Sequence, residues 1–344
     1  MSGFLAVLVV VLIFIVIFQI AKASEYVSIL KGEKKSRQQS NRINGFLLIA
    51  FLVLGLVGVY YCNDILKGKI LGDSASEQGE GIDTLIYVTL AITGIVFVIT
   101  QILLFWFAYK YQEREGQKAF YFPHNNKLEV IWTVIPAIAL TILVAFGLKH
   151  WFQITSEAPK DAAIVEITGK QFNWMIRYAG KDGLLGRKDF KKIDAAGSNP
   201  LGQDWEDQLN KDDIMSSEMH LVVNKPVKLI IGSQDVIHDV GLPHFRLKMD
   251  AVPGIPTTLW FTPKYTTKQM KEKTGNPDFV YEISCDQMCG SGHYSMRAVI
   301  VVETQEEFDA WAAKQKSQYD LAHATAAPAA PAADSTQKAV AANK

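Results

Sequence analysis

The chain has 344 residues, 35 Lys and Arg side chains against 35 Asp and Glu, and 49% hydrophobic residues. Because these charges balance, whole-chain electrostatics argues against a nucleic acid as partner. The length leaves room for more than one structural unit. Residues 1–150 are far more apolar than the rest, so the sequence predicts a membrane part followed by a water-soluble part.

Four apolar segments approach or exceed the length of about 20 residues that a helix needs to cross a bilayer. They are residues 3–21, 45–62, 84–109 and 129–150. No Lys or Arg precedes the first segment, and it is long for a cleaved signal, so we expect a retained span. Loop 22–45 carries six Lys and Arg and loop 110–128 carries four, against two in loop 63–83. Since cytoplasmic loops collect basic residues, we expect the N-terminus and everything after residue 150 to be periplasmic.

The soluble part contains short stretches of alternating hydrophobicity, separated in several places by Gly, Pro and Asn. They are residues 164–169, 227–233, 257–262, 279–284 and 297–303. Short strands without alternating helices predict a β-sandwich or small barrel. We expect a closing helix with Thr304 as N-cap and Glu307 in the capping-box position. Residues 180–215 are interpreted as an excursion from the sheet, and the Ala/Pro-rich residues 319–344 as a disordered tail.

The segment CDQMCGSGHYSM at 285–296 gathers two cysteines, a histidine and a methionine. A disulfide is one interpretation in an oxidising compartment. A zinc site lacks its second ligand pair and would have to use Met, a poor zinc ligand. A mononuclear copper site needs one Cys and leaves the other unused. Two thiolates suit a pair of copper ions that both sulfurs bridge, in which case each ion needs one imidazole.

His293 supplies one imidazole, so a second must come from elsewhere in the chain. Of the seven histidines, two lie at span ends and one in the tail, which leaves His220, His238 and His244. His238 follows the predicted strand 227–233 in what reads as a turn that reaches a neighbouring loop, and spacing favours it modestly. His244 is expected to be a surface or packing residue.

Several motifs together resemble subunit II of the haem–copper cytochrome c oxidases. SQDVIH at 233–238, KMDAVPG at 248–254 and CDQMCGSGHYSM follow a membrane hairpin in the order typical of that family. NNKLEVIWTVIPAIAL at 125–140 is similar to the start of its second span, and GKQFNWMIRY at 169–178 to its aromatic stretch. The resemblance extends over roughly residues 84–318.

The resemblance implies four transmembrane helices followed by an all-β, cupredoxin-like Greek-key domain that carries the binuclear copper centre CuA. The implied division is an extra two-span segment 1–83, a helical hairpin 84–150, a CuA domain 151–318 and the tail 319–344. The implied ligands are two bridging thiolates, two imidazoles, an axial thioether and an axial backbone carbonyl, namely Cys285, Cys289, His238, His293, Met296 and the carbonyl of Gln287.

The implied function is electron entry into a respiratory oxidase of the bacterial inner membrane. CuA takes electrons from a cytochrome c and passes them to haem in subunit I, where dioxygen is reduced to water and protons are pumped. The implied partners are subunit I, with the haems and CuB, and subunit III. Nitrous-oxide reductase is a poorer match because it is expected to be soluble, and a quinol oxidase subunit would lack the ligands. From another class, a membrane-anchored scaffold protein with a Cys285–Cys289 disulfide stays open.

The chain departs from the family pattern at the site where the electron enters. Phe172 stands where the family usually has Trp and Arg177 where it has an acid, which leaves Trp174 as the aromatic residue for electron entry. Residues 151–318 hold 23 acids and 20 bases, so steering of a basic, freely diffusing cytochrome c is weak. We therefore expect a donor held in place, either a membrane-anchored cytochrome c or a haem subunit of a partner complex, docked on the two extra spans.

Three other residues carry expectations from the resemblance. Gln287 replaces a Glu that helps to bind magnesium at the subunit I interface, and a neutral amide is a weaker ligand for that cation, so this magnesium site is put in question. Glu129 matches the carboxylate at the mouth of a proton path, and equally fits a helix-start acid that interacts with the macrodipole. Asp250 matches an interface aspartate and equally fits a solvated loop acid.

Overall fold

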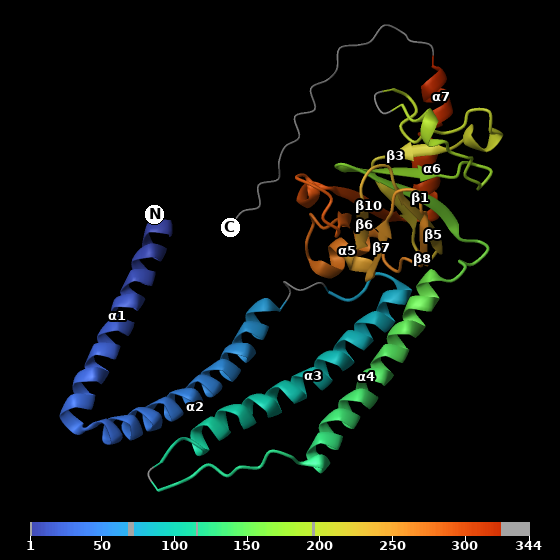
Figure 1. Ribbon diagram of the computed structural model, residues 1–344. Helices are drawn as coiled ribbons and strands as arrows, with labels where there is room; N and C mark the ends of the chain where they lie inside the picture. Colours follow the sequence, from blue (N-terminus) through green and yellow to red (C-terminus); the bar gives the residue numbers. More distant parts are fainter. Residues whose placement is uncertain (1, 68–71, 115, 195–196, 325–344) are drawn as a thin grey trace. The chain divides into compact units, whose positions relative to one another are not determined.

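The computed structural model describes residues 2–67, 72–114, 116–194 and 197–324 (Figure 1). The chain divides into two compact units, Met1–Ile70 with Thr84–Ala145, and Leu71–Asp83 with Phe146–Lys344. The first unit is helical and the second holds the β-sheets. The long helices are α1 (Ser2–Lys31), α2 (Glu33–Leu66), α3 (Glu77–Lys110) and α4 (Asn126–Thr155).

All four long helices have stretches apolar and long enough to cross a bilayer, which confirms the four predicted spans. Their apolar side chains are largely exposed in the chain alone, as expected of surfaces that face lipid. The prediction of a loop at 22–45 is wrong, because α1 continues to Lys31 and α2 begins at Glu33. The Lys, Glu, Gln and Arg residues in this stretch are good helix formers. Only Gly32, with a φ of 80°, interrupts them.

The β unit contains two five-stranded sheets, in the orders β3-β2-β1-β5-β8 and β4-β10-β9-β6-β7. The pairs β1–β5 and β4–β10 are parallel and the other pairs are antiparallel, so both sheets are mixed. The strands are β1 (Ala163–Lys170), β2 (Asn173–Tyr178), β3 (Ile214–Ser216), β4 (Met219–Val222), β5 (Val227–Ser233), β6 (His238–Leu242), β7 (Leu247–Ala251), β8 (Thr257–Phe261), β9 (Tyr281–Cys285) and β10 (Arg297–Glu303).

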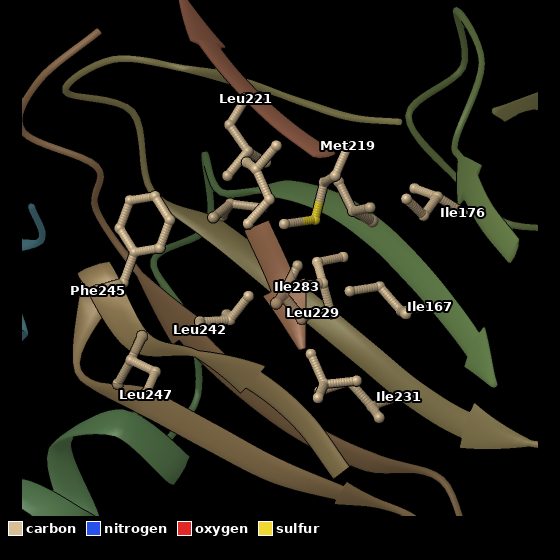
Figure 2. Close-up of a cluster of buried hydrophobic side chains, with 14 of the residues drawn as sticks. Ile167, Ile176, Met219, Leu221, Leu229, Ile231, Leu242, Phe245, Leu247 and Ile283 are labelled. Carbon is tan, nitrogen blue, oxygen red and sulfur yellow. The ribbon is translucent and has the colours of Figure 1, made fainter. Parts of the chain in front are cut away.

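All five predicted strands are present, as β1, β5, β8, β9 and β10. The alternating patterns of β5 and β9 reflect one buried face, because buried and half-buried residues alternate along both strands. Ile167 and Leu229 from one sheet and Ile283 from the other are fully buried in the shared core (Figure 2). The missed strands β2 and β6 are buried along almost their whole length, so they lack this alternation.

Short helices close the unit. These are α5 (Thr267–Thr274), α6 (Gln305–Ala312) and α7 (Gln318–His323), with the 3-10 turns η1 (Phe190–Lys192), η2 (Gln208–Asn210), η3 (Pro243–Phe245) and η4 (His293–Ser295). The capping box of Thr304 and Glu307 on α6 is confirmed. The prediction of a disordered tail is wrong for its first residues, because they belong to α7. Ser317 caps this helix, and the N–H of Gln318 donates to the Asp213 carbonyl at 2.9 Å. Residues 325–344, the rest of that prediction, lie outside the described residues.

Arg177 anchors the excursion 180–215, which lies outside both sheets until β3 begins. Its side chain is 1% exposed. The guanidinium donates to Glu166 Oε2 at 3.0 Å, to Asp213 Oδ2 at 2.5 Å and to the Gly186 carbonyl at 2.7 Å. A fourth hydrogen bond goes to Asn210 Oδ1 at 2.7 Å. The departure from the family's acid at this position therefore has a structural role, because one buried cation joins β1, β2 and the excursion.

The start of α3 is bound to the β unit next to η3. The hydroxyl of Ser76 donates to the Phe245 carbonyl at 2.7 Å, and the N–H of Ala75 to the His244 carbonyl at 2.8 Å. Arg246 forms an ion pair with Asp83 at 2.6 Å, with both side chains mostly buried. These contacts fix the turn between β6 and β7, so they also support the strand that begins at His238.

Candidate metal centre

The predicted ligands converge at one end of the second sheet. Cys285 is the last residue of β9, and Cys289, His293 and Met296 follow it within one loop. The antiparallel register pairs Val240 of β6 with Cys285, which brings the start of β6 to the same end. His238 is therefore the first residue of a strand, and the expectation that it lies in a turn is wrong.

The donor atoms form a chain of close contacts. The two sulfurs, Cys285 Sγ and Cys289 Sγ, lie 3.7 Å apart. His238 Nδ1 is 3.8 Å from Cys285 Sγ, and His293 Nδ1 is 3.7 Å from Cys289 Sγ. Met296 Sδ lies 3.9 Å from Cys289 Sγ, and the Gln287 carbonyl accepts from Cys285 Sγ at 3.2 Å. Each sulfur thus has its own imidazole and one further weak donor.

These separations fit metal ions and exclude a disulfide in this structure. Both cysteines are free, and 3.7 Å is far longer than the S–S bond of about 2.05 Å. A metal bound to imidazole nitrogen and thiolate sulfur has bond lengths of about 2.0 and 2.3 Å, which together span the observed N···S separations. The ligand atoms of His238, Cys285 and Cys289 all lie within 4.8 Å of one another. Two thiolates, two imidazoles and a thioether form a donor set suited to copper.

The site is enclosed and dry. His238 and Met296 are fully buried, Cys285 and Cys289 nearly so, and His293 is half-buried. Burial is the main reason that the pKa of the Cys289 thiol rises to about 11, and the adjacent Cys285 sulfur adds to the effect. The Cys289 thiol therefore keeps its proton at neutral pH unless a cation replaces it, so metal binding at Cys289 is coupled to proton release.

Two residues that the sequence analysis did not single out hold the ligands. Asp235 Oδ1 accepts from His238 Nε2 at 2.9 Å, which leaves Nδ1 with its lone pair towards the sulfur. Burial acts to raise the pKa of Asp235, but hydrogen bonds from Gln171 N–H, His238 and Val236 N–H outweigh it and lower the pKa. The side chain of Gln171 donates to the Cys289 carbonyl at 2.5 Å. Gln171 thus connects the two chain segments that carry the ligands.

The aromatic residues differ in their access to solvent. Trp174 is 3% exposed and packs edge-on against His238, with ring centroids 5.8 Å apart. Phe172 is 37% exposed, and its ring covers the ligand loop so closely that a Cβ added to Gly292 would lie 2.5 Å from it. A protein that docks from outside can therefore touch Phe172, whereas Trp174 lies one layer further in.

The remaining predicted residues lie elsewhere. His220 is buried, stacks on Trp311 at 3.9 Å and has Nδ1 2.8 Å from Glu303, so it is not near the sulfurs. His244 packs edge-on against the rings of Phe279 and Tyr281, as expected of a packing histidine.

Three further side chains are exposed. Glu129 lies in the first turn of α4, and Asp250 lies on β7 opposite Asp239. The residue Gln287 is exposed as well. Nothing in these positions brings the three side chains into the cluster of sulfurs and imidazoles.

The fold and the site together define a class: a membrane-bound protein whose cupredoxin-like sandwich carries a cluster of soft metal donors. Models of the transmembrane and periplasmic domains of cytochrome c oxidase subunit II match residues 65–149 and 164–304. The chain therefore belongs to the cytochrome c oxidase subunit II family, as the resemblance predicted, and its β unit is the periplasmic domain of that family.

Curated relatives agree with this membership. The alternative cytochrome c oxidase subunit 2 of Bradyrhizobium diazoefficiens is 37% identical over 69% of this chain and 80% of its own length. Subunit 2 of Cereibacter sphaeroides is 27% identical over 72% of this chain and 80% of its own. The crystal structure of the periplasmic domain of subunit II of Bradyrhizobium japonicum cytochrome oxidase is 25% identical, with a TM-score of 0.33, and covers 47% of this chain and 99% of that one.

Proposed function

We propose that this chain is the electron-entry subunit of a haem–copper cytochrome c oxidase, and that six of its groups hold the binuclear copper centre. The thiolates of Cys285 and Cys289 would be two of the groups that hold the two ions. The other groups are the imidazoles of His238 and His293, the Met296 thioether and the Gln287 carbonyl. The observation that carries the proposal is the pair of sulfurs 3.7 Å apart, each with an imidazole nitrogen within 3.8 Å.

When bound, two copper ions supply a carrier that accepts and releases one electron at a time. The protein contributes a rigid cage: His238 is held by Asp235, and the loop of Cys289 is held by Gln171. Because His238 and Cys289 are both buried, the cage changes little between oxidation states and excludes water. The charge of Asp235 beside the imidazole stabilises the more positive, oxidised state.

The membrane arrangement follows from the charges of the loops. We infer an inner-membrane protein whose N-terminus and β unit face the periplasm, with the basic ends of α1, α2 and α3 in the cytoplasm. Subunit I, with the haems that receive the electron, and subunit III are the expected partners. We further propose that Glu129, in the first turn of α4, lies at the entrance of a proton path. Gln287 at the periplasmic face offers no carboxylate for magnesium.

Electrons would enter through the surface beside the metal centre. Phe172 covers the ligand loop, Met288 is 73% exposed and Tyr294 84% exposed, so the surface offered to a donor includes three accessible apolar or aromatic side chains. Trp174 lies inside it against His238 and is placed as the inner contact of the entry route. Contact through these side chains, together with the near balance of acids and bases in residues 151–318, suits a donor that is held near its site. If no c-type haem co-purifies in mild detergent and soluble cytochrome c is oxidised fast with steep salt dependence, a held donor is excluded.

Rapid mixing of the intact oxidase with a reduced c-type cytochrome tests electron entry. We expect the copper absorbance to change before the haem of subunit I is reduced, and His293→Asn to slow haem reduction about a hundredfold or more, since it removes a ligand. Phe190→Leu is the matched control, because Phe190 is exposed in η1. Haem reduction at the wild-type rate in His293→Asn would contradict the proposed route, and a metal-free disulfide would support the scaffold interpretation.

A further inference from the structure

A groove opens between α2 and α3 at the end of the helical unit opposite to the start of α3. The helices meet at Gly45, where an added Cβ would lie 3.1 Å from the ring of Tyr109. Phe46 packs on the same ring, with centroids 5.3 Å apart. Beyond this contact, two hollows of about 520 and 250 Å³ share Gln38, Glu113 and Arg114 as lining residues.

The groove is rich in cations and hydrogen-bond donors. Among the lining residues that the structure describes, the basic side chains are Lys34, Arg37, Arg42 and Arg114, and the acid is Glu113. Arg37 is 3.9 Å from Glu113, an exposed ion pair that contributes little. Within the described part of the chain, neither Arg42 nor Arg114 has a carboxylate at ion-pair distance. The neutral side chains that line the groove are Gln38, Asn41, Gln112, Gln117 and Tyr109.

The groove lies at the depth of lipid headgroups. Arg42 directly precedes the apolar stretch of α2, and Tyr109 ends that of α3. Arg42 lies over the ring of Phe46, 6.0 Å from its centroid, so its charge borders the apolar surface. Beyond it, Phe46 is 51% and Leu47 61% exposed in the chain alone, as lipid-facing residues would be.

We propose that this groove binds the phosphate headgroup of an anionic phospholipid whose acyl chains lie along α2. Guanidinium groups match phosphate oxygens in pairs, and basic pockets between transmembrane helices attract anionic headgroups. The continuous apolar surface beyond Arg42 favours a lipid over a free anion. The family match begins at residue 65, so the part of α2 that lines the groove lies outside it. The site is independent of the metal centre.

Native mass spectrometry of the full chain, released from a neutral detergent, measures the binding. The chain is titrated with phosphatidylglycerol, with phosphatidylcholine of the same acyl chains and with inorganic phosphate. We expect phosphatidylglycerol to bind at least tenfold more tightly than phosphatidylcholine. Arg42→Gln with Arg114→Gln should weaken it roughly 25-fold, since each basic residue near the surface contributes about fivefold. Glu113→Gln should strengthen it, which no loss of folding can imitate.

Lys118→Gln with Lys127→Gln is the matched control, because it removes the same charge from residues that do not line the groove. This control should bind phosphatidylglycerol as the wild type does. The proposal is overturned if phosphatidylcholine binds equally well, if the control loses as much as the arginine variant, or if inorganic phosphate at equal concentration displaces the lipid. It is also overturned if Glu113→Gln leaves the affinity unchanged.

Discussion

Replacing Arg177 with methionine removes the one buried cation that joins β1, β2 and the excursion. Glu166 keeps Lys188, whose Nζ is 2.6 Å from its Oε1, but Asp213 is fully buried and loses its partner at 2.5 Å. Breaking one side of a buried ion pair costs about 3–5 kcal/mol, because a charge stays buried without compensation. For a domain of this size we expect the unfolding temperature to fall by roughly 6–20 °C.

The loss should depend on pH. Burial raises the pKa of Asp213 and Arg177 opposes it, so without Arg177 the pKa rises further. An acid whose pKa is higher in the folded than in the unfolded state binds its proton more tightly when folded. Its contribution to stability is therefore lost as pH rises through the folded-state pKa. The loss of folding stability in Arg177→Met, relative to the wild type, should be larger at pH 8 than at pH 5. Adding Asp213→Asn to this variant should restore part of the lost stability.

Thermal unfolding of the full chain in detergent, followed by near-ultraviolet circular dichroism, measures these differences. Arg297→Met is the matched control, because Arg297 is 47% exposed and pairs with Glu282 at 3.1 Å on the surface. Arg297→Met should lower the free energy of unfolding by about 1 kcal/mol or less. The reasoning fails if Arg177→Met shifts the transition no more than this control, or if adding Asp213→Asn makes the variant still less stable.

Three further predictions concern the metal centre. Asp235→Asn removes the charge beside His238, so we expect copper affinity to fall about 10–100-fold and the reduction potential to rise, as equilibrium dialysis and redox titration would measure. Gly292→Ala should push the ring of Phe172 aside, because the added methyl would lie 2.5 Å from it. Stopped-flow mixing should then show slower electron uptake with an unchanged copper spectrum, and an unchanged rate would count against Phe172 as the entry surface. Removing copper with a chelator should lower the unfolding temperature of the β unit, because the folded state loses about 2.7 kcal/mol of stabilisation for copper at a hundred times its dissociation constant, as calorimetry would measure.

Much of the site could be predicted because it is local in sequence. Cys285, Cys289, His293 and Met296 belong to one loop of twelve residues, so their proximity needs no knowledge of the fold. His238 was harder, because only the antiparallel register of β6 and β9 brings it to the sulfurs. Spacing favoured it only modestly among three histidines, and the resemblance to the oxidase family decided between them.

The supporting residues depend on tertiary contacts that sequence patterns do not encode. Gln171 reaches the Cys289 carbonyl across 118 positions of the chain, and no periodicity marks it. Asp235 had a weak signal, as an acid three residues before a candidate ligand. Arg177 was noticed only as a departure from the family, and its pairing with Asp213 requires the excursion to fold back over β2. The helical stretch at 22–45 was missed because charge was taken as a sign of a loop.

Copper analysis of the purified full chain, together with electron paramagnetic resonance, tests the central claim most directly. We predict two copper ions per chain and, in the one-electron-oxidised state, a hyperfine pattern from an unpaired electron shared equally by two copper nuclei. Cys289→Ser should abolish that pattern. A single copper with an ordinary four-line spectrum, or a metal-free chain in which Cys285 and Cys289 form a disulfide, would contradict the account.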